Sequence, residues 1–218
     1  MVCAESFSIL PSRYSVTGSF SLGYGMGEGA ETAKGAFLET GADTALITGA
    51  ELWQAEAFAG WPLGRRFCLD LGVVLGPSGF AVVGRDPAGN PVEGRRYSSM
   101  NLDAAVLASF EWPVQSGLAY FGLAPFFGFV LAGGQVVLKT DGVTSRYSVP
   151  ADEMTEASLG GMLRGGYSLP AGLGYLTAGL KITYRYTTVK GFLTDDTVPL
   201  HLVTPSVSLG YSLKDVGR

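Results

Sequence analysis

From residue 14 onward the chain alternates between apolar residues and small or polar ones. Between residues 14 and 26, every second residue is aromatic, aliphatic or glycine, and the residues between them are serine, threonine or glycine. A period of two is the period of a β-strand with one apolar and one polar face. The pattern recurs and predicts eight strands, at residues 14–26, 45–61, 66–76, 98–112, 118–131, 155–169, 173–187 and 200–213.

The connections between these strands alternate between short and long. Three are short and rich in proline and glycine, at residues 62–65, 113–117 and 170–172, and four are long, at residues 27–44, 77–97, 132–154 and 188–199. Strands that are apolar outside and hydroxyl-lined inside, with short turns at one rim and long loops at the other, are typical of bacterial outer-membrane barrels. We therefore predict an all-β fold: an eight-stranded antiparallel transmembrane up-and-down β-barrel at residues 14–213, between an N-terminal periplasmic segment at 1–13 and a C-terminal tail at 214–218.

The predicted orientation follows from the even number of strands, which places both termini at the rim of the short turns. In an outer membrane this rim is periplasmic, and the long loops are extracellular. An interfacial girdle of aromatic residues is expected at the same rim. The aromatic residues near these strand ends are Tyr14, Trp61, Phe67, Trp112, Tyr167, Tyr175 and Tyr211.

The composition agrees with a lipid-facing surface. Only 16% of the 218 residues are charged and the mean hydropathy is +0.26, whereas a soluble protein has about 25% charged residues. A net charge of −4 argues against nucleic acid as a partner. The uncharged stretch between Glu111 and Lys139 is long enough for a transmembrane helix, but its repeated glycine and proline favour two strands joined by a turn. Cys3 and Cys68 are the only cysteines; they either pair or are an incidental tail residue and a small lumen-facing one.

The last predicted strand ends in the residues 204–213, TPSVSLGYSL. With the strand pattern and the loop asymmetry, it resembles the small eight-stranded outer-membrane barrels: the OmpA membrane domain, OmpX, the opacity proteins and OmpW. In that family the terminal strand is read by the barrel-assembly machinery and usually ends in an aromatic residue, whereas this chain has Leu213 there, followed by residues 214–218. The resemblance implies the fold, the outer membrane as location, and outer-membrane lipid and the assembly machinery as partners; it does not imply a function.

Ionisable residues on the predicted inner face are the next guide to function. The acidic ones are on the second to fourth strands and the basic ones on the sixth and seventh, so they meet across a lumen narrow enough to be filled by side chains. Charges there must be paired or hydrated. We predict that Glu56 or Asp70 faces Arg164 and that Asp103 faces Lys181, as a structural plug or as a gate in a narrow pore. The cluster comprises Glu56, Asp70, Asp103, Glu111, Arg164, Lys181 and Arg185.

Apolar residues are also predicted to line the lumen. They are Phe58, Val74, Leu107, Phe126, Val130 and Met162. A partly apolar lumen resembles that of OmpW, whose family is associated with the passage of small hydrophobic molecules. The alternatives are simple core filling, or a shift of one residue in the strand at 118–131, which would exchange its two faces.

No catalytic or metal site is predicted. His201 is the only histidine, and because Val203 follows it at the second position, no His-x-Ser pair is present. A nucleophile requires a base within hydrogen-bond reach, and His201 is predicted to face outward at the loop end of the last strand. We expect no enzymatic activity, no cofactor and no metal.

The loops are the other candidate for function. Residues 135–147 alternate well enough to extend the fifth strand beyond the membrane, and loops on a rigid barrel are natural binding surfaces. The leading prediction is that the barrel passes or binds small hydrophobic solutes. The alternative is a surface adhesin or a structural barrel that acts through its extracellular loops, with host surface molecules as partners.

Overall fold

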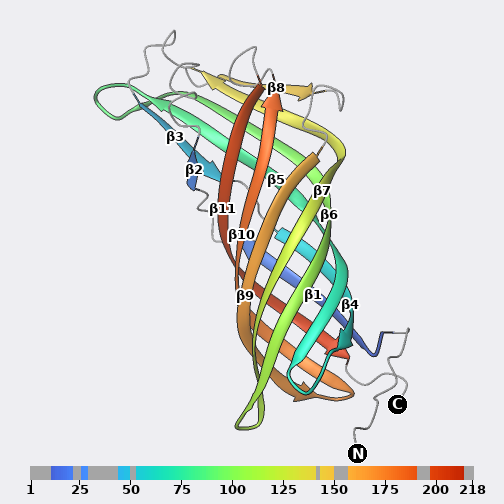
Figure 1. The fold of residues 1–218 in the computed structure, drawn as a ribbon. Helices are drawn as coiled ribbons and strands as arrows, with labels where there is room; N and C mark the ends of the chain where they lie inside the picture. The colour runs from blue at the N-terminus through green and yellow to red at the C-terminus, as the bar shows by residue number, and fades with distance from the viewer. Residues whose placement is uncertain are drawn as a thin grey trace, which may run out of the picture.

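The computed structural model describes residues 11–21, 26–28, 44–49, 53–140, 143–149, 157–190 and 197–213. These residues form strands joined by turns (Figure 1). None of the described residues belongs to a helix that could cross a membrane. The strands are β1 (Arg13–Ser21), β2 (Met26–Glu28), β3 (Thr44–Gly49), β4 (Trp53–Pro62), β5 (Phe67–Arg85), β6 (Pro91–Val114), β7 (Gly117–Thr140), β8 (Val143–Val149), β9 (Ala157–Ala171), β10 (Gly174–Lys190) and β11 (Thr197–Leu213).

Eight of these strands close into a barrel. They follow the order β1-β4-β5-β6-β7-β9-β10-β11, and β11 pairs with β1 to complete the circle. All of the pairings are antiparallel, and the pair of Tyr14 with Leu213 places the start of β1 beside the end of β11. The predicted all-β, eight-stranded antiparallel barrel is therefore confirmed. Closure gives every backbone amide in the paired wall a neighbour and leaves no free edge there.

The strands are staggered as well as closed. A path that starts at Ser15 on β1 and steps from one register partner to the next around the barrel arrives at Leu202 on β11. Ser15 itself pairs with Ser212, ten residues after Leu202 on the same strand. Such a stagger tilts the strands by about 35–45° from the barrel axis. The intermediate partners are Phe58, Gly72, Ala105, Phe126, Gly160 and Arg185.

The predicted loop at 77–97 is wrong. β5 and β6 continue through it as paired strands, and only residues 86–90 form a turn. β7 likewise continues to Thr140 and pairs with β8, so the predicted extension of the fifth strand is confirmed. This part of the sheet does not separate a polar lumen from an apolar exterior, so neither of its faces has to be apolar. Residues 77–97 therefore lack the period-two pattern that reveals the barrel strands.

The extensions build an open sheet at one end of the barrel, in the order β3-β5-β6-β7-β8. Figure 1 shows β3 and β8 at the end opposite the short turns. The predicted strand at 45–61 is two strands, β3 and β4, both paired with β5. Most of the predicted loop at 27–44 and residues 191–196 lie outside the described residues.

The alternation of buried and exposed residues agrees with the predicted faces. Phe121, Leu123, Phe127 and Phe129 on β7 are exposed and Phe126 is buried, so the two faces of this stretch are not exchanged. The pairing of β7 with β6 becomes irregular only near the end of the stretch, opposite Met100. At the short turns, the hydroxyl of Tyr167 donates to the carbonyl of Val114 at 2.7 Å and that of Tyr211 to the carbonyl of Ala171 at 2.9 Å. These two girdle tyrosines thus hold the chain at the turns as well as covering the rim.

Candidate functional site

The polar interior of the barrel is the candidate site. All seven ionisable residues of the predicted cluster face inward, and all but Glu111 are almost fully buried. Arg13 joins them from the start of β1, with a side chain that is 12% exposed. The sum of these charges is zero, since four carboxylates face four cations. They form three groups at increasing distance from the short turns, which we name the rim, middle and upper groups.

The rim group consists of Arg13, Asp70 and Glu111. Nη1 of Arg13 donates to Oε1 of Glu111 at 2.5 Å, and its Nε lies 3.8 Å from Oδ1 of Asp70. Arg13 is not among the residues predicted to face the lumen, because the predicted first strand begins one residue later, at Tyr14. Continuing the period of two backward from Thr17 through Ser15 places Arg13 on the inner face, so the signal was present. Cys68, also buried and facing inward, is a free thiol, and Cys3 lies outside the described residues.

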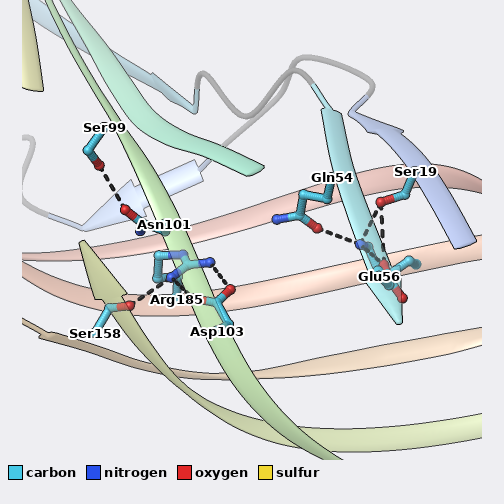
Figure 2. A network of polar contacts seen from close by, with 9 residues as sticks. Ser19, Gln54, Glu56, Ser99, Asn101, Asp103, Ser158 and Arg185 are labelled. Carbon is cyan, nitrogen blue, oxygen red and sulfur yellow. Dashed lines mark hydrogen bonds and ion pairs between the residues drawn. The ribbon is translucent and has the colours of Figure 1, made fainter. Parts of the chain in front are cut away.

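The middle group has one carboxylate and two cations. Glu56 accepts a hydrogen bond from Nζ of Lys181, and Nη1 of Arg164 lies 3.5 Å from its Oε2. Lys181 also donates to Oγ of Ser19 at 2.7 Å and to Oε1 of Gln54 at 2.5 Å; Figure 2 shows Ser19, Gln54 and Glu56 joined in this network. The predicted pairing of Glu56 with Arg164 is confirmed, but Lys181 holds Glu56 more closely.

The upper group is a forked ion pair between Asp103 and Arg185. The two guanidinium nitrogens lie 3.0 and 2.6 Å from the two carboxylate oxygens, and Nη1 also donates to Oγ of Ser158 at 2.7 Å (Figure 2). The predicted pairing of Asp103 with Lys181 is therefore wrong. Asp103 lies eleven residues before the end of β6 and Arg185 eleven residues after the start of β10, whereas Lys181 lies only seven after it. Residues that meet in the lumen lie at similar distances from the short turns. The prediction took no account of this distance.

Gly128 makes room for the upper group. It is the register partner of both Asp103 on β6 and Ser158 on β9. A Cβ atom at this position would lie 2.2 Å from Oδ1 of Asp103 and 2.5 Å from Oγ of Ser158. The absence of a side chain therefore lets the carboxylate, the hydroxyl and the guanidinium meet across β7. Glycine on the inner face of a strand was the available signal for this residue.

Apolar side chains fill the lumen beside the charged groups. Of the six predicted lining residues, five are at most 5% exposed and contact one another in a single cluster, whereas Val130 is half-buried and lies outside it. Phe58 lies against Gly72, where a Cβ atom would be 2.4 Å from its ring, and Phe126 lies against Gly160 in the same way. Such contacts make a packed core. The cluster consists of Phe58, Val74, Ala105, Leu107, Ala124, Phe126 and Met162.

The free space beside these groups is small. A cavity of about 20 Å³ lies between Arg13, Glu56 and Arg164, which is room for about one water molecule. Within the described part of the chain, no three His, Cys, Asp or Glu side chains are placed to hold a metal ion. The arrangement can therefore lock the strands together and order a particle of atomic size, but a larger solute does not fit into this cavity.

His201 lies outside the lumen, as predicted, on the outward face of β11. Its Nδ1 is 2.7 Å from the hydroxyl of Tyr184, and its ring centroid is 5.1 Å from that of Tyr186. The three side chains form an aromatic and polar cluster on the outer wall, twelve residues from the short-turn end of β11. This placement is typical of an interfacial residue.

The solved structures that are similar to this chain include a surface protein and an outer membrane protein. The similarity to the crystal structure of Neisserial surface protein A extends over 95% of this chain and 99% of that protein's chain, at 12% sequence identity and a TM-score of 0.41. The similarity to the crystal structure of the outer membrane protein OprG from Pseudomonas aeruginosa extends over 94% of this chain and 97% of that protein's chain, at 8% sequence identity and a TM-score of 0.45. No protein-family model matches the chain, and no curated protein does. Identities this low say nothing about what the protein binds.

Proposed function

We propose that this protein is an integral outer-membrane barrel of a bacterium with two membranes, which acts through the sheet that continues beyond the barrel. The distribution of side chains supports the membrane location. Among the buried residues that the structure describes, polar and charged ones outnumber hydrophobic ones, while large hydrophobic side chains such as Leu123, Leu180 and Leu209 are more than half exposed. A soluble protein has the reverse arrangement. In the proposed orientation, the short turns face the periplasm and the open sheet lies outside the cell.

The length of β6 and β7 is the observation that carries the proposal. Each strand has 24 residues, whereas a tilted strand crosses a bilayer with about 9–11. The excess residues belong to the five-stranded sheet outside the barrel, in which the hairpin of β5 and β6 ends in the turn at 86–90. A rigid barrel with a packed interior anchors this sheet, and surfaces anchored in this way commonly carry binding functions. The proposed role is to bind molecules at the cell surface, and the proposed partners are host surface molecules.

A shortened barrel tests this role. Ser78 and Ser99 are register partners, so residues 79–98 can be replaced by an Asn-Gly turn, which favours a tight hairpin. We expect the shortened protein to fold in detergent, shown by a change in gel mobility on boiling, and to lose binding to immobilised extracellular-matrix glycoproteins. A matched control, Leu180→Val on the lipid-facing wall, keeps the whole sheet and should bind as the unchanged protein does. Equal binding by the shortened protein would contradict the proposal.

The second candidate is binding or passage of small hydrophobic solutes. The apolar cluster around Leu107, which lies inside the lumen, favours it. Flux of a small hydrophobic fluorophore into liposomes would be the measurement. Flux above that of empty liposomes that Leu107→Trp abolishes would support this candidate, and flux equal to that of empty liposomes would remove it.

A further inference from the structure

The small cavity between the rim and middle groups has features of a binding site. Its volume is about 20 Å³, and its lining includes Arg13, Glu56, Arg164, Lys181 and Ser212. Three of these residues are cations and one is a carboxylate. The carboxylates of the rim group, Asp70 and Glu111, do not belong to the lining. The immediate surface of the cavity therefore carries an excess of positive charge.

Buried donors in this lining have no hydrogen-bond partner. Arg164 is only 8% exposed and its Nε–H is unpartnered, and Ser212 is 1% exposed with an unpartnered hydroxyl. Nε of Arg13 likewise makes no hydrogen bond, although it lies 3.8 Å from Oδ1 of Asp70. The lining also holds one unpartnered acceptor, Oε2 of Glu56, so its unpartnered donors outnumber its unpartnered acceptors by three to one. Lys181, by contrast, already donates to three oxygen atoms. Buried donors in native proteins nearly always have a partner, so these donors point to an occupant that accepts hydrogen bonds.

The charge of the middle group indicates what kind of occupant this is. Glu56 is paired with both Lys181 and Arg164, so the group has one positive charge more than it has negative. Guanidinium groups only donate hydrogen bonds, and bonds from a charged donor to an anion are the stronger kind. The volume suits one small particle.

We propose that the cavity binds one halide-sized anion, held by Nε of Arg164, Nε of Arg13 and the hydroxyl of Ser212. Chloride is the anion of this size that both sides of an outer membrane contain. It satisfies the three unpartnered donors and faces the surplus positive charge of the lining, which the two carboxylates of the rim group balance only from outside the cavity. The site is independent of the role proposed above for the extracellular sheet, since it lies near the opposite end of the barrel.

Crystals of the full chain grown in bromide test the site directly. The expected result is an anomalous peak within contact distance of Nε of Arg164 and Oγ of Ser212. A well-ordered water at this position without anomalous signal would overturn the proposal, and so would bromide bound only elsewhere on the molecule. This experiment needs no variant.

A solution measurement checks that binding does not depend on the crystal. The ³⁵Cl NMR linewidth of sodium chloride should broaden in the presence of the detergent-folded protein, and bromide should reverse the broadening whereas sulfate should not. Ser212→Val fills the cavity and should abolish the broadening. Ser206→Val is the matched control, because Ser206 is also a buried lumen serine on β11 but does not line the cavity. Equal broadening by the two variants would contradict the proposal.

Discussion

The middle and upper groups of the lumen are built from the same parts but satisfied differently. In each, an arginine lies over an inward phenylalanine, Arg164 over Phe58 at 5.2 Å and Arg185 over Phe126 at 4.8 Å. Each phenylalanine lies against a glycine of the next strand. Each arginine also faces a carboxylate. The two groups are thus a repeated arrangement of arginine, phenylalanine, glycine and carboxylate at two levels of one barrel.

The difference lies in how many cations share the carboxylate. Within the described ranges, Asp103 forms its ion pair with Arg185, through two hydrogen bonds, and Ser158 accepts a third from the same guanidinium. Glu56 serves two cations, so Arg164 is left at 3.5 Å and keeps one donor unpartnered. Removing one member of a one-to-one buried pair leaves an uncompensated charge, whereas a shared carboxylate keeps its other partner. The upper group therefore holds the barrel more firmly than Arg164 does.

The largest effect is expected from Arg185→Met. The change leaves Asp103 charged and unpaired in the lumen, and we expect the free energy of unfolding to fall by about 3–5 kcal/mol. Urea unfolding in lipid vesicles, followed by tryptophan fluorescence, measures this quantity. The double variant Asp103→Leu with Arg185→Met removes both charges and should recover most of the loss. A loss below about 1 kcal/mol for the single variant would refute the ranking of the two groups.

Gly128→Ala should have the next largest effect. The added methyl group collides with the carboxylate of Asp103 and the hydroxyl of Ser158, and overpacking of this kind costs about 1–3 kcal/mol. Gly161→Ala is the control, since its Cβ atom would meet only a backbone oxygen at 3.8 Å. In an Asp103→Ala background the cost of Gly128→Ala should shrink. An unchanged cost in that background would show that the glycine acts through another neighbour.

Arg164→Met should cost less than either change, roughly 1–2 kcal/mol, because it removes a loose ion pair and a cation–π contact while Lys181 still neutralises Glu56. The same urea titration gives the comparison with Arg185→Met. Lys181→Met serves as the reciprocal test, since it removes the closer partner of Glu56 and should cost more than Arg164→Met. The opposite order would mean that Arg164 is the principal partner of Glu56.

The smallest effect lies outside the barrel, at the turn of residues 86–90. Hydrogen bonds from the backbone and side chain of Asn90 hold the pKa of Asp86 below its ordinary value, and the backbone of Ala88 adds another. A lowered folded pKa means that the contribution is present above the unfolded pKa and is lost as the pH falls through the folded value. Amide exchange at Ala88 and Asn90 should therefore show weaker protection in acid, relative to unstructured peptide at the same pH. Asp86→Asn should remove this pH dependence and leave the lumen groups unaltered; a persistent dependence would assign it to another group.

The barrel could be predicted from the sequence because one physical constraint acts on every strand. A wall between a polar lumen and an apolar exterior requires side chains to alternate, and a shift of one residue would reverse every face. For this reason the strand at 118–131 was predicted with the correct register. Where that constraint stops, in the sheet at 77–97, the prediction failed.

Alternation and composition are local properties of the chain, so the sequence already indicates which residues face inward and that their charges oppose one another. Which charges meet depends on how the strands are placed in space. Strand stagger and the depth of each residue from its short turn bring Asp103 to Arg185 and leave Lys181 to Glu56. Inward glycines such as Gly128 then decide where long side chains can cross a neighbouring strand. These are properties of how strands are placed beside one another, and no single strand contains them.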